Sequence, residues 1–158
     1  MIRSSLIAIT AIAAVLAVGG AGFASAASPA DHGQTFRVRE TITAVGSVDA
    51  APAGLSPGDE SILHLQIATL AGKAIGVNDA VCTVLAPVSA GLAHCVGTGT
   101  LPGGTIEWGG DLRLNAAPDT FAITGGTGSY RDAAGQIGVR YTNPPTNAKV
   151  IVTIRLAG

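Results

Sequence analysis

The sequence contains little charge: acidic and basic residues make up 12% of its 158 residues, whereas 47% are hydrophobic. A chain with so much apolar surface and so little charge can bury a core, which excludes an intrinsically disordered protein. The 9 Lys and Arg residues form no cluster and are balanced by 10 Asp and Glu residues, for a net charge of −1. Nucleic acid is therefore not expected as a partner, because binding to phosphates needs a basic patch.

Residues for metal or nucleophilic chemistry are scarce as well. The three histidines, His32, His64 and His94, are dispersed along the chain without the spacing of metal ligands. No G-x-S-x-G motif occurs, so nothing indicates a hydrolase built on that motif. We therefore predict no metal site and no Ser-His-Asp triad.

The first 26 residues have the pattern of an export signal. A positive charge at Arg3 precedes an apolar run from Leu6 to Val18, and the small residues Ala24 and Ala26 suit signal peptidase. Cleavage after Ala27 fits nearly as well. A membrane anchor is the alternative, but the run is shorter than the ~20 residues that span a bilayer. We therefore expect a secreted protein, extracellular or in the cell envelope, with no membrane span.

The cysteine count is low but even. Cys82 and Cys95 are the only cysteines, and in an exported protein an even count favours a disulfide. Antiparallel pairing across a turn between Leu85 and Leu92 would place Cys82 directly opposite Cys95. A catalytic thiol and two inert buried thiols are the alternatives.

Glycine is abundant, with 22 residues spaced so that few stretches could form a helix of three turns. Between the glycines, β-branched and apolar residues alternate with polar ones, which predicts strands. We predict eight: Thr35–Val45, Ser61–Leu70, Lys73–Leu85, Leu92–Leu101, Thr105–Leu114, Thr120–Thr124, Gln136–Thr142 and Ala148–Leu156. One domain therefore covers residues 35–158, preceded by a flexible N-terminus over 27–34.

Eight short strands must hide their edges, and a barrel hides all of them. We therefore predict an all-β fold, an eight-stranded antiparallel β-barrel, with a two-sheet sandwich as the alternative. A barrel of eight strands holds side chains or one small ligand.

Alternation along the strands predicts which side chains point inward. The inner row of the first strand contains Phe36, Val38, Glu40, Ile42 and Ala44, which places one carboxylate among apolar side chains. The same alternation places an aromatic side chain on the inner face of the fifth and of the seventh strand.

A glycine-rich segment, Gly125-Gly126-Thr127-Gly128, follows the sixth predicted strand. It partly fits the G-x-G-x-x-G turn of dinucleotide-binding enzymes, but Arg131 occupies the position of the third glycine. The preceding chain also lacks strand-helix-strand units, so we expect no nicotinamide cofactor.

The same segment resembles the signature of the plant allene oxide cyclases and the related dirigent proteins, A-I-T-G-G-[ST]-G-x-[FY]-x-x-x-x-G-[QE]. Residues Phe121–Gln136 read FAITGGTGSYRDAAGQ. Gly58-Asp59, Gly76–Cys82 and Gly104–Ile106 resemble further motifs of these barrels, in the same order. The resemblance thus covers most of the predicted domain.

This resemblance implies an eight-stranded antiparallel barrel, often a homo-trimer, whose apolar cavity binds a small hydrophobic molecule without a cofactor. Allene oxide cyclases close an epoxide-bearing fatty-acid derivative into a cyclopentenone. Dirigent proteins steer the coupling of phenoxy radicals or close quinone methides. If this protein is an enzyme, the resemblance implies a cofactor-independent isomerase or cyclase.

Only part of the family's polar set is matched. The first-strand glutamate of the cyclases falls on Glu40, but the asparagine two residues later is Ile42, and the second-strand asparagine is Leu65. The cavity cysteine matches Cys82, which a disulfide would remove as a thiol. The first arginine of the dirigent motif is Arg131. The missing asparagines argue against allene oxide cyclisation itself.

Glu40 is the candidate catalytic residue. A carboxylate on an apolar inner row is costly unless it is paired or used, and burial should raise its pKa. The structural alternative is an ion pair with Arg113 or Arg140 near a mouth of the barrel.

Phe36, Trp108, Tyr141 and Arg131 are the candidate ligand-binding residues. The structural alternative makes the three aromatic residues part of the core, and makes Arg131 a donor to loop carbonyls after the glycine-rich turn.

Two hypotheses of function from different classes follow. In the first, a secreted barrel binds a small hydrophobic ligand and steers its cyclisation or coupling. In the second, the protein is a non-enzymatic secreted carrier or an envelope-associated structural module that keeps the barrel without the chemistry. A secreted protease-inhibitor-like sandwich is a third hypothesis, which a closed barrel would eliminate.

Overall fold

The computed structural model describes residues 33–86, 91–113, 119–142 and 149–158. The predicted export segment 1–26, most of the N-terminal segment 27–34, and the predicted strand ends Leu114 and Ala148 lie outside the described residues. Within the described ranges, no helix is long and apolar enough to span a membrane.

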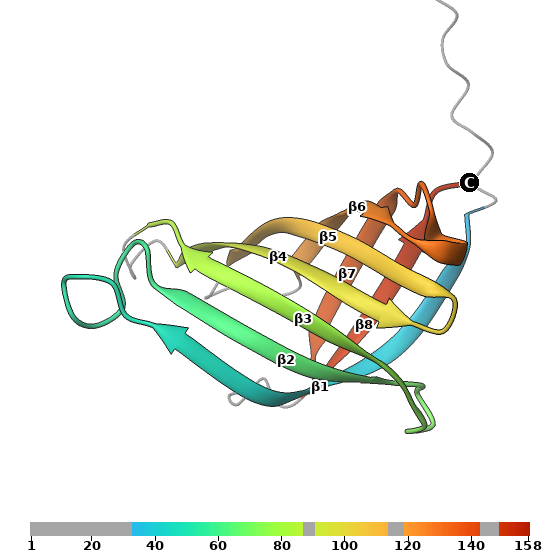
Figure 1. The fold of residues 1–158 in the computed structure, drawn as a ribbon, viewed down its shortest axis with the longest axis horizontal. Coiled ribbons are helices and arrows are strands. Elements are labelled where there is room, and N and C mark those ends of the chain that lie inside the picture. The colour runs from blue at the N-terminus through green and yellow to red at the C-terminus, as the bar shows by residue number, and fades with distance from the viewer. Residues whose placement is uncertain (1–32, 87–90, 114–118, 143–148) are drawn as a thin grey trace, which may run out of the picture.

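Eight antiparallel strands close into a barrel in sequence order (Figure 1). They are β1 (Thr35–Val48), β2 (Glu60–Ala68), β3 (Ala74–Val84), β4 (Leu92–Leu101), β5 (Gly104–Arg113), β6 (Asp119–Gly126), β7 (Gly135–Tyr141) and β8 (Lys149–Leu156). Because β8 pairs with β1, the sheet has no free edge. The predicted barrel is confirmed, and the closed sheet eliminates the sandwich.

All eight predicted strands are present, and their type and order are correct. The boundaries of β4 match at both ends, and the largest difference is at β1, which continues to Val48 instead of ending at Val45. A 3-10 turn, η1 (Gly128–Tyr130), was not predicted. It follows the glycine-rich segment between β6 and β7.

The core fills the barrel interior, because alternate residues of each strand point inward. The most buried side chains include Val38 of β1, Ile67 of β2, Ile106 of β5 and Val152 of β8, each 2% exposed. On β2, by contrast, His64 and Gln66 alternate with these inward residues and are exposed. The two faces are therefore sorted as alternation predicts.

Ala44 is the exception to the predicted inner row of β1. It is exposed and pairs with the outward residue His64, whereas Ile42 pairs with the inward residue Leu65. A β-bulge between Ile42 and Ala44 shifts the register and reverses the faces of the following residues. The prediction that Ala44 points inward was therefore wrong.

The glycine-rich segment packs against the turn between β4 and β5. Ser129 donates a backbone hydrogen bond to the carbonyl of Gly103, and Thr127 donates one to Thr105. Gly128 has φ +60°, and a Cβ there would overlap the Gly103 carbonyl. A larger residue at Gly128 would therefore be both strained and obstructed. The family signature builds a turn that joins two barrel connections.

The Gly58-Asp59 motif holds the loop between β1 and β2. The carboxylate of Asp59 accepts hydrogen bonds from the backbone amides of Ser56 at 2.7 Å and Ala50 at 2.8 Å. These backbone hydrogen bonds, that from Ser56 first, lower the pKa of Asp59 because they stabilise its charged form. The motif thus has a structural role at this end of the barrel.

A disulfide joins Cys82 of β3 to Cys95 of β4. The two residues are direct partners in the ladder, and the Leu85 amide donates to the Leu92 carbonyl at 2.9 Å, as the predicted register requires. Both cysteines point inward and are buried. The disulfide therefore fixes two strands that line the barrel interior.

Replacing both cysteines should lower stability. In the loop-entropy model, a disulfide that closes a loop of this length contributes about 3 kcal/mol. The double variant C82A/C95A should therefore lower the free energy of unfolding by about that amount in urea titrations. Denatured protein purified from the native export route should also contain no titratable thiol. Two free thiols, or an unchanged unfolding midpoint, would contradict the stabilising disulfide.

Candidate functional site

The barrel encloses a cavity of about 120 Å³ that is lined mainly by apolar side chains. Its lining residues are Glu40, Leu63, Leu65, Ile67, Asn78, Ala80, Cys82, Cys95, Gly99, Leu101, Ile106, Trp108, Leu112, Phe121, Ile137, Val139, Tyr141, Val150, Val152 and Ile154. Four carry polar side-chain groups outside the disulfide: Glu40, Asn78, Trp108 and Tyr141. Among the described residues, no Lys, Arg or His lines this cavity.

Glu40, Asn78 and Trp108 form a hydrogen-bonded chain inside the barrel. The Asn78 amide Nδ2 donates to Glu40 Oε2 at 3.1 Å, and Trp108 Nε1 donates to Asn78 Oδ1, also at 3.1 Å. The residues come from β1, β3 and β5, so three alternate strands contribute one member each. Asn78 thereby fixes one carboxylate oxygen of Glu40 and is itself fixed by Trp108.

Burial raises the pKa of Glu40 to about 7, and the hydrogen bond from Asn78 lowers it in part. Glu40 is 6% exposed. The alternative of an ion pair with Arg113 or Arg140 is not realised, since both arginines are exposed and the partner of Glu40 is Asn78. A carboxyl group with a pKa near 7 can both donate and accept a proton at neutral pH.

The second oxygen of Glu40 faces cavity space. Within the described residues, every side-chain nitrogen or oxygen that is sealed from solvent has a hydrogen-bond partner. The single side-chain hydrogen bond of Glu40 is to Oε2, so Oε1 is not sealed. Because Glu40 lines the cavity and is otherwise buried, Oε1 is the carboxyl oxygen that is open to the cavity.

A second polar pair lies where β6 begins and β7 ends. The Tyr141 hydroxyl donates to Asp119 Oδ2 at 3.2 Å, and the Arg113 amide donates to Asp119 Oδ1 at 3.3 Å. Burial, followed by the charge and hydrogen bond of Asp119, raises the pKa of Tyr141 to about 12. The phenol therefore stays neutral in the physiological range, with its proton directed to Asp119.

The position of Trp108 depends on the absence of a side chain at Gly97. The two residues are partners across β4 and β5, and a Cβ at Gly97 would overlap the indole ring. Trp108 also contacts Phe121, with ring centroids 4.9 Å apart. Gly97 thus lets the indole reach Asn78, and Phe121 supports the ring from the next strand.

The structure brings three of the predicted site residues together and leaves two apart. Glu40, Trp108 and Tyr141 line the cavity. Phe36 is half-buried against the core and is not among the lining residues. Arg131 is exposed just after η1 and is not among the lining residues of the cavity.

Two polar residues of the site were missed, Asn78 and Asp119. Asn78 lies in a predicted strand, and counting by two from the inward Cys82 through Ala80 places it on the inner face. Asp119 lies one residue before the predicted strand 120–124 and was left outside it. Strand alternation was therefore a usable signal for Asn78, whereas Asp119 was hidden by an error in a strand boundary.

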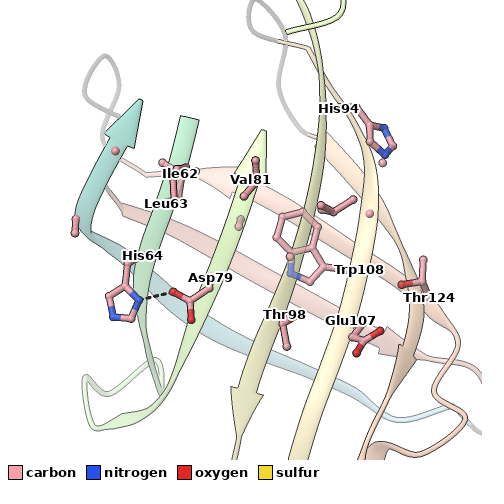
Figure 2. Close-up of a pocket in the computed structure, with 17 residues that line it drawn as sticks. Ile62, Leu63, His64, Asp79, Val81, His94, Thr98, Glu107, Trp108 and Thr124 are labelled. Carbon is pink, nitrogen blue, oxygen red and sulfur yellow. Dashed lines mark hydrogen bonds and ion pairs between the residues drawn. The ribbon is translucent and has the colours of Figure 1, made fainter. Parts of the chain in front are cut away.

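A larger open hollow, of about 740 Å³, lies on the outer side of the barrel wall over β1–β6. Figure 2 shows His64 and Asp79 facing each other at one side, with Glu107 and Thr124 at the other. Its polar side chains are exposed: His64 and Asp79 have 47% and 64% of their side-chain surfaces accessible. The inner cavity is the better candidate site, because only there is a carboxyl group removed from water.

A closed antiparallel barrel of eight strands around a small apolar cavity defines the class of small β-barrels. The family model of the allene oxide cyclase barrel like domain matches residues 39–154. The chain belongs to this family, which confirms the resemblance found in the sequence. Comparison with curated proteins gives no significant match.

Three solved structures with the same fold are named for different activities. A pyocyanin demethylase matches with a TM-score of 0.69 and 25% identity, over 78% of this chain and 100% of that chain. The pterocarpan synthase dirigent protein PsPTS1 matches with a TM-score of 0.66 and 16% identity, over 79% and 94%. The Diels Alderase AbmU from Streptomyces koyangensis matches with a TM-score of 0.62 and 18% identity, over 80% and 70%.

Substituting Glu40 with Gln should stabilise the protein at neutral and alkaline pH. Because its folded-state pKa is raised from 4.5 to about 7, the folded state binds the extra proton between these values. The wild type should therefore lose stability as pH rises through this window, by about 3 kcal/mol in total. Glu40→Gln retains an acceptor for Asn78 and should lack this loss.

The measurement is urea unfolding of both proteins at pH 4, 5.5, 7 and 8.5. The two curves of stability against pH should converge at pH 4 and separate toward pH 8.5. Glu107→Gln, which removes an exposed carboxylate of β5, is the matched control and should follow the wild type. Parallel curves for the wild type and Glu40→Gln would contradict a raised pKa at Glu40.

Proposed function

We propose that this barrel binds a small, largely apolar molecule in its interior and that Glu40 acts on it as an acid or base, steering a cyclisation or coupling without a cofactor. The observation that carries the proposal is a carboxyl group with a pKa near 7 on the wall of an apolar cavity. Such a group is costly to bury, and a proton-transfer role is a physical reason for its position.

The geometry supports a division of labour among the cavity residues. Asn78 holds Oε2 of Glu40 and Trp108 holds Asn78, so the carboxyl group presents Oε1 in a fixed direction. The apolar walls exclude water and restrict the conformations of a flexible ligand. A bound molecule would therefore meet one oriented acid in surroundings that favour a folded, ring-closing conformation.

The family and its solved relatives support a cavity function but not one reaction. The matched structures carry the names of a demethylase, a dirigent protein and a Diels Alderase. One fold hosts different chemistries, so the reaction has to be argued from the site. Among the described residues, Glu40 is the only one with a carboxyl group that lines this cavity.

The size of the cavity supports a second candidate, a non-enzymatic carrier or structural module. Ligand sites for drug-sized molecules usually measure roughly 300–1,000 Å³. The enclosed volume here is about 120 Å³. The family asparagines replaced by Ile42 and Leu65 favour the same candidate. In an enzyme, replacing Glu40 would change the turnover of the bound molecule. In a carrier, the replacement would change only the amount of the molecule that is bound.

Native mass spectrometry of the exported protein, followed by organic extraction, tests both candidates. We expect a small molecule to travel with the wild type. At saturating concentrations of the extracted molecule, Glu40→Gln should lower its turnover by roughly 10²–10⁴-fold, the usual contribution of a general acid or base. If turnover is unchanged in this variant, the carrier is the correct candidate.

Gly99→Ala is the matched test of where the molecule binds. Gly99 lines the cavity, and a Cβ there would contact Ile67 Cδ1 at 3.8 Å, an ordinary packing distance. The variant should fold normally, reduce the cavity and lower the occupancy of the bound molecule. Full occupancy in Gly99→Ala, or an empty wild type, would contradict binding inside the barrel.

We also propose that the protein acts outside the cytoplasm as a homo-trimer. The disulfide supports an oxidising compartment, and the resemblance to often trimeric barrels supports the assembly. The outer hollow offers an apolar contact surface, since Ile62 and Val96 are 47% and 51% exposed there.

The intact mass of the exported protein tests both statements. Cleavage after Ala26 or Ala27 should give a chain that begins at residue 27 or 28, and the native spectrum should contain three copies. Val96→Glu should dissociate the trimer, because it places a charge in an apolar contact. A wild-type monomer at micromolar concentration would contradict the trimer, and a chain that retains residues 1–26 would contradict export by signal cleavage.

A further inference from the structure

We infer that the cavity selects a compact organic cation about the size of one aromatic ring, with Glu40 as its counter-ion. This inference rests on the proposed function in one respect, that a ligand occupies the cavity. It adds the charge and the size of that ligand, which neither the fold nor the family match determines.

The first argument is the set of hydrogen-bonding groups left open to a ligand. The Trp108 N–H is used by Asn78, and the Tyr141 proton is used by Asp119. When Glu40 is ionised, what remains is the free Oε1 of Glu40 and the lone pairs of the Tyr141 oxygen, which are acceptors. In that state the second N–H of Asn78 is the one remaining side-chain donor among the described lining residues, and it carries no charge.

The second argument is charge. The lining residues include Glu40 but no Lys, Arg or His, and Asp119 lies directly behind Tyr141. An anionic ligand would therefore be buried without a counter-charge, next to two acidic side chains. A cation would supply the partner that Glu40 lacks, because the only side-chain partner of Glu40 is the neutral amide of Asn78.

The third argument is the chemistry of the walls. Trp108, Phe121 and Tyr141 all line the cavity, and the rings of Trp108 and Phe121 are 4.9 Å apart. Aromatic faces attract cations, and this attraction strengthens when water is excluded. The walls therefore favour a cation with apolar substituents over a hydrated metal ion or a simple ammonium ion.

The fourth argument is volume. An apolar protein cavity of about 150 Å³ binds benzene. The cavity here, at about 120 Å³, is of the same order and therefore accommodates a single ring. A long fatty-acid derivative would exceed this space, and its carboxylate would have no counter-charge. Size and charge therefore lead to the same class, a monocyclic cation such as an N-alkylated heteroaromatic ring.

The test compares three probes of similar size on the full barrel: N-methylpyridinium, the neutral isostere toluene and the anion benzoate. Isothermal titration at pH 8.5 should give at least about tenfold tighter binding of N-methylpyridinium than of toluene, and no detectable binding of benzoate. In Glu40→Gln the advantage of the cation over toluene should disappear, while the affinity for toluene stays within about twofold.

A change of pH provides a second readout that needs no variant. Protonation of Glu40 below its pKa of about 7 should remove the preference for N-methylpyridinium at pH 5.5. Tyr141 is the only other titratable group among the lining residues. Its pKa of about 12 keeps it neutral at both pH values. Behind it, the Asp119 carboxylate accepts hydrogen bonds from the Arg113 amide and the Tyr141 hydroxyl. Toluene binding should be the same at the two pH values.

The outcomes separate this inference from the proposed function. Equal or tighter binding of toluene or benzoate in the wild type would overturn the selection of a cation but leave a ligand cavity in place. A cation preference that persists in Glu40→Gln and disappears in Glu107→Gln would assign binding to the outer hollow, and would also overturn the inference. Failure of all three probes to bind would overturn the proposed cavity function itself.

Discussion

The pairing of β1 with β8 is the constraint on which the rest of the structure depends. Once the sheet is closed, the side chains of alternate residues on each strand point into one shared interior. Glu40 pairs with Val150 across this closing ladder and is thereby committed to the inside. An open sheet would let the carboxyl group reach water, and its pKa would then resemble that of an ordinary glutamate.

Closure also explains how residues distant in sequence form one network. Glu40, Asn78 and Trp108 lie on β1, β3 and β5, and in small barrels the inward residues of alternate strands meet in layers. The disulfide and Gly97 also help to position the side chains of this network. Cys82–Cys95 fixes β3 against β4, and Gly97 leaves the room that the indole occupies. The acid is therefore positioned by strand geometry, with only one direct hydrogen-bonding side chain.

The energetic consequence is that the interior is not optimised for stability alone. Most of the interior is aliphatic, and a well-packed apolar residue in place of Glu40 would avoid the cost of burying a carboxylate. The hydrogen bond from Asn78 offsets only part of that cost, since the pKa remains raised. This cost at neutral pH supports the proposed proton-transfer role of Glu40, because perturbed pKa values cluster at functional sites.

Much of the fold could be predicted from the sequence because it depends on local pattern. Alternation gave the strands and the inward position of Glu40, and the spacing of Cys82 and Cys95 gave the β3–β4 register. The bulge that turns Ala44 outward has no comparable local signal, because it arises from the pairing of β1 with β2. The contact between Asn78 and Glu40 depends on the stagger of strands around the barrel, which a single sequence does not specify.

The two ends of the barrel differ in what they can accommodate. The Leu156 amide donates to the Gln34 carbonyl, so the beginning of β1 and the end of β8 meet beside the η1 turn (Figure 1). Tyr141 lies at the opposite end, where the cavity walls become more exposed. The first and last described residues therefore lie at the end of the barrel away from the phenol. The two ends thus differ in chemistry: one holds the chain ends and the glycine-rich turn, and the other holds the Tyr141–Asp119 pair.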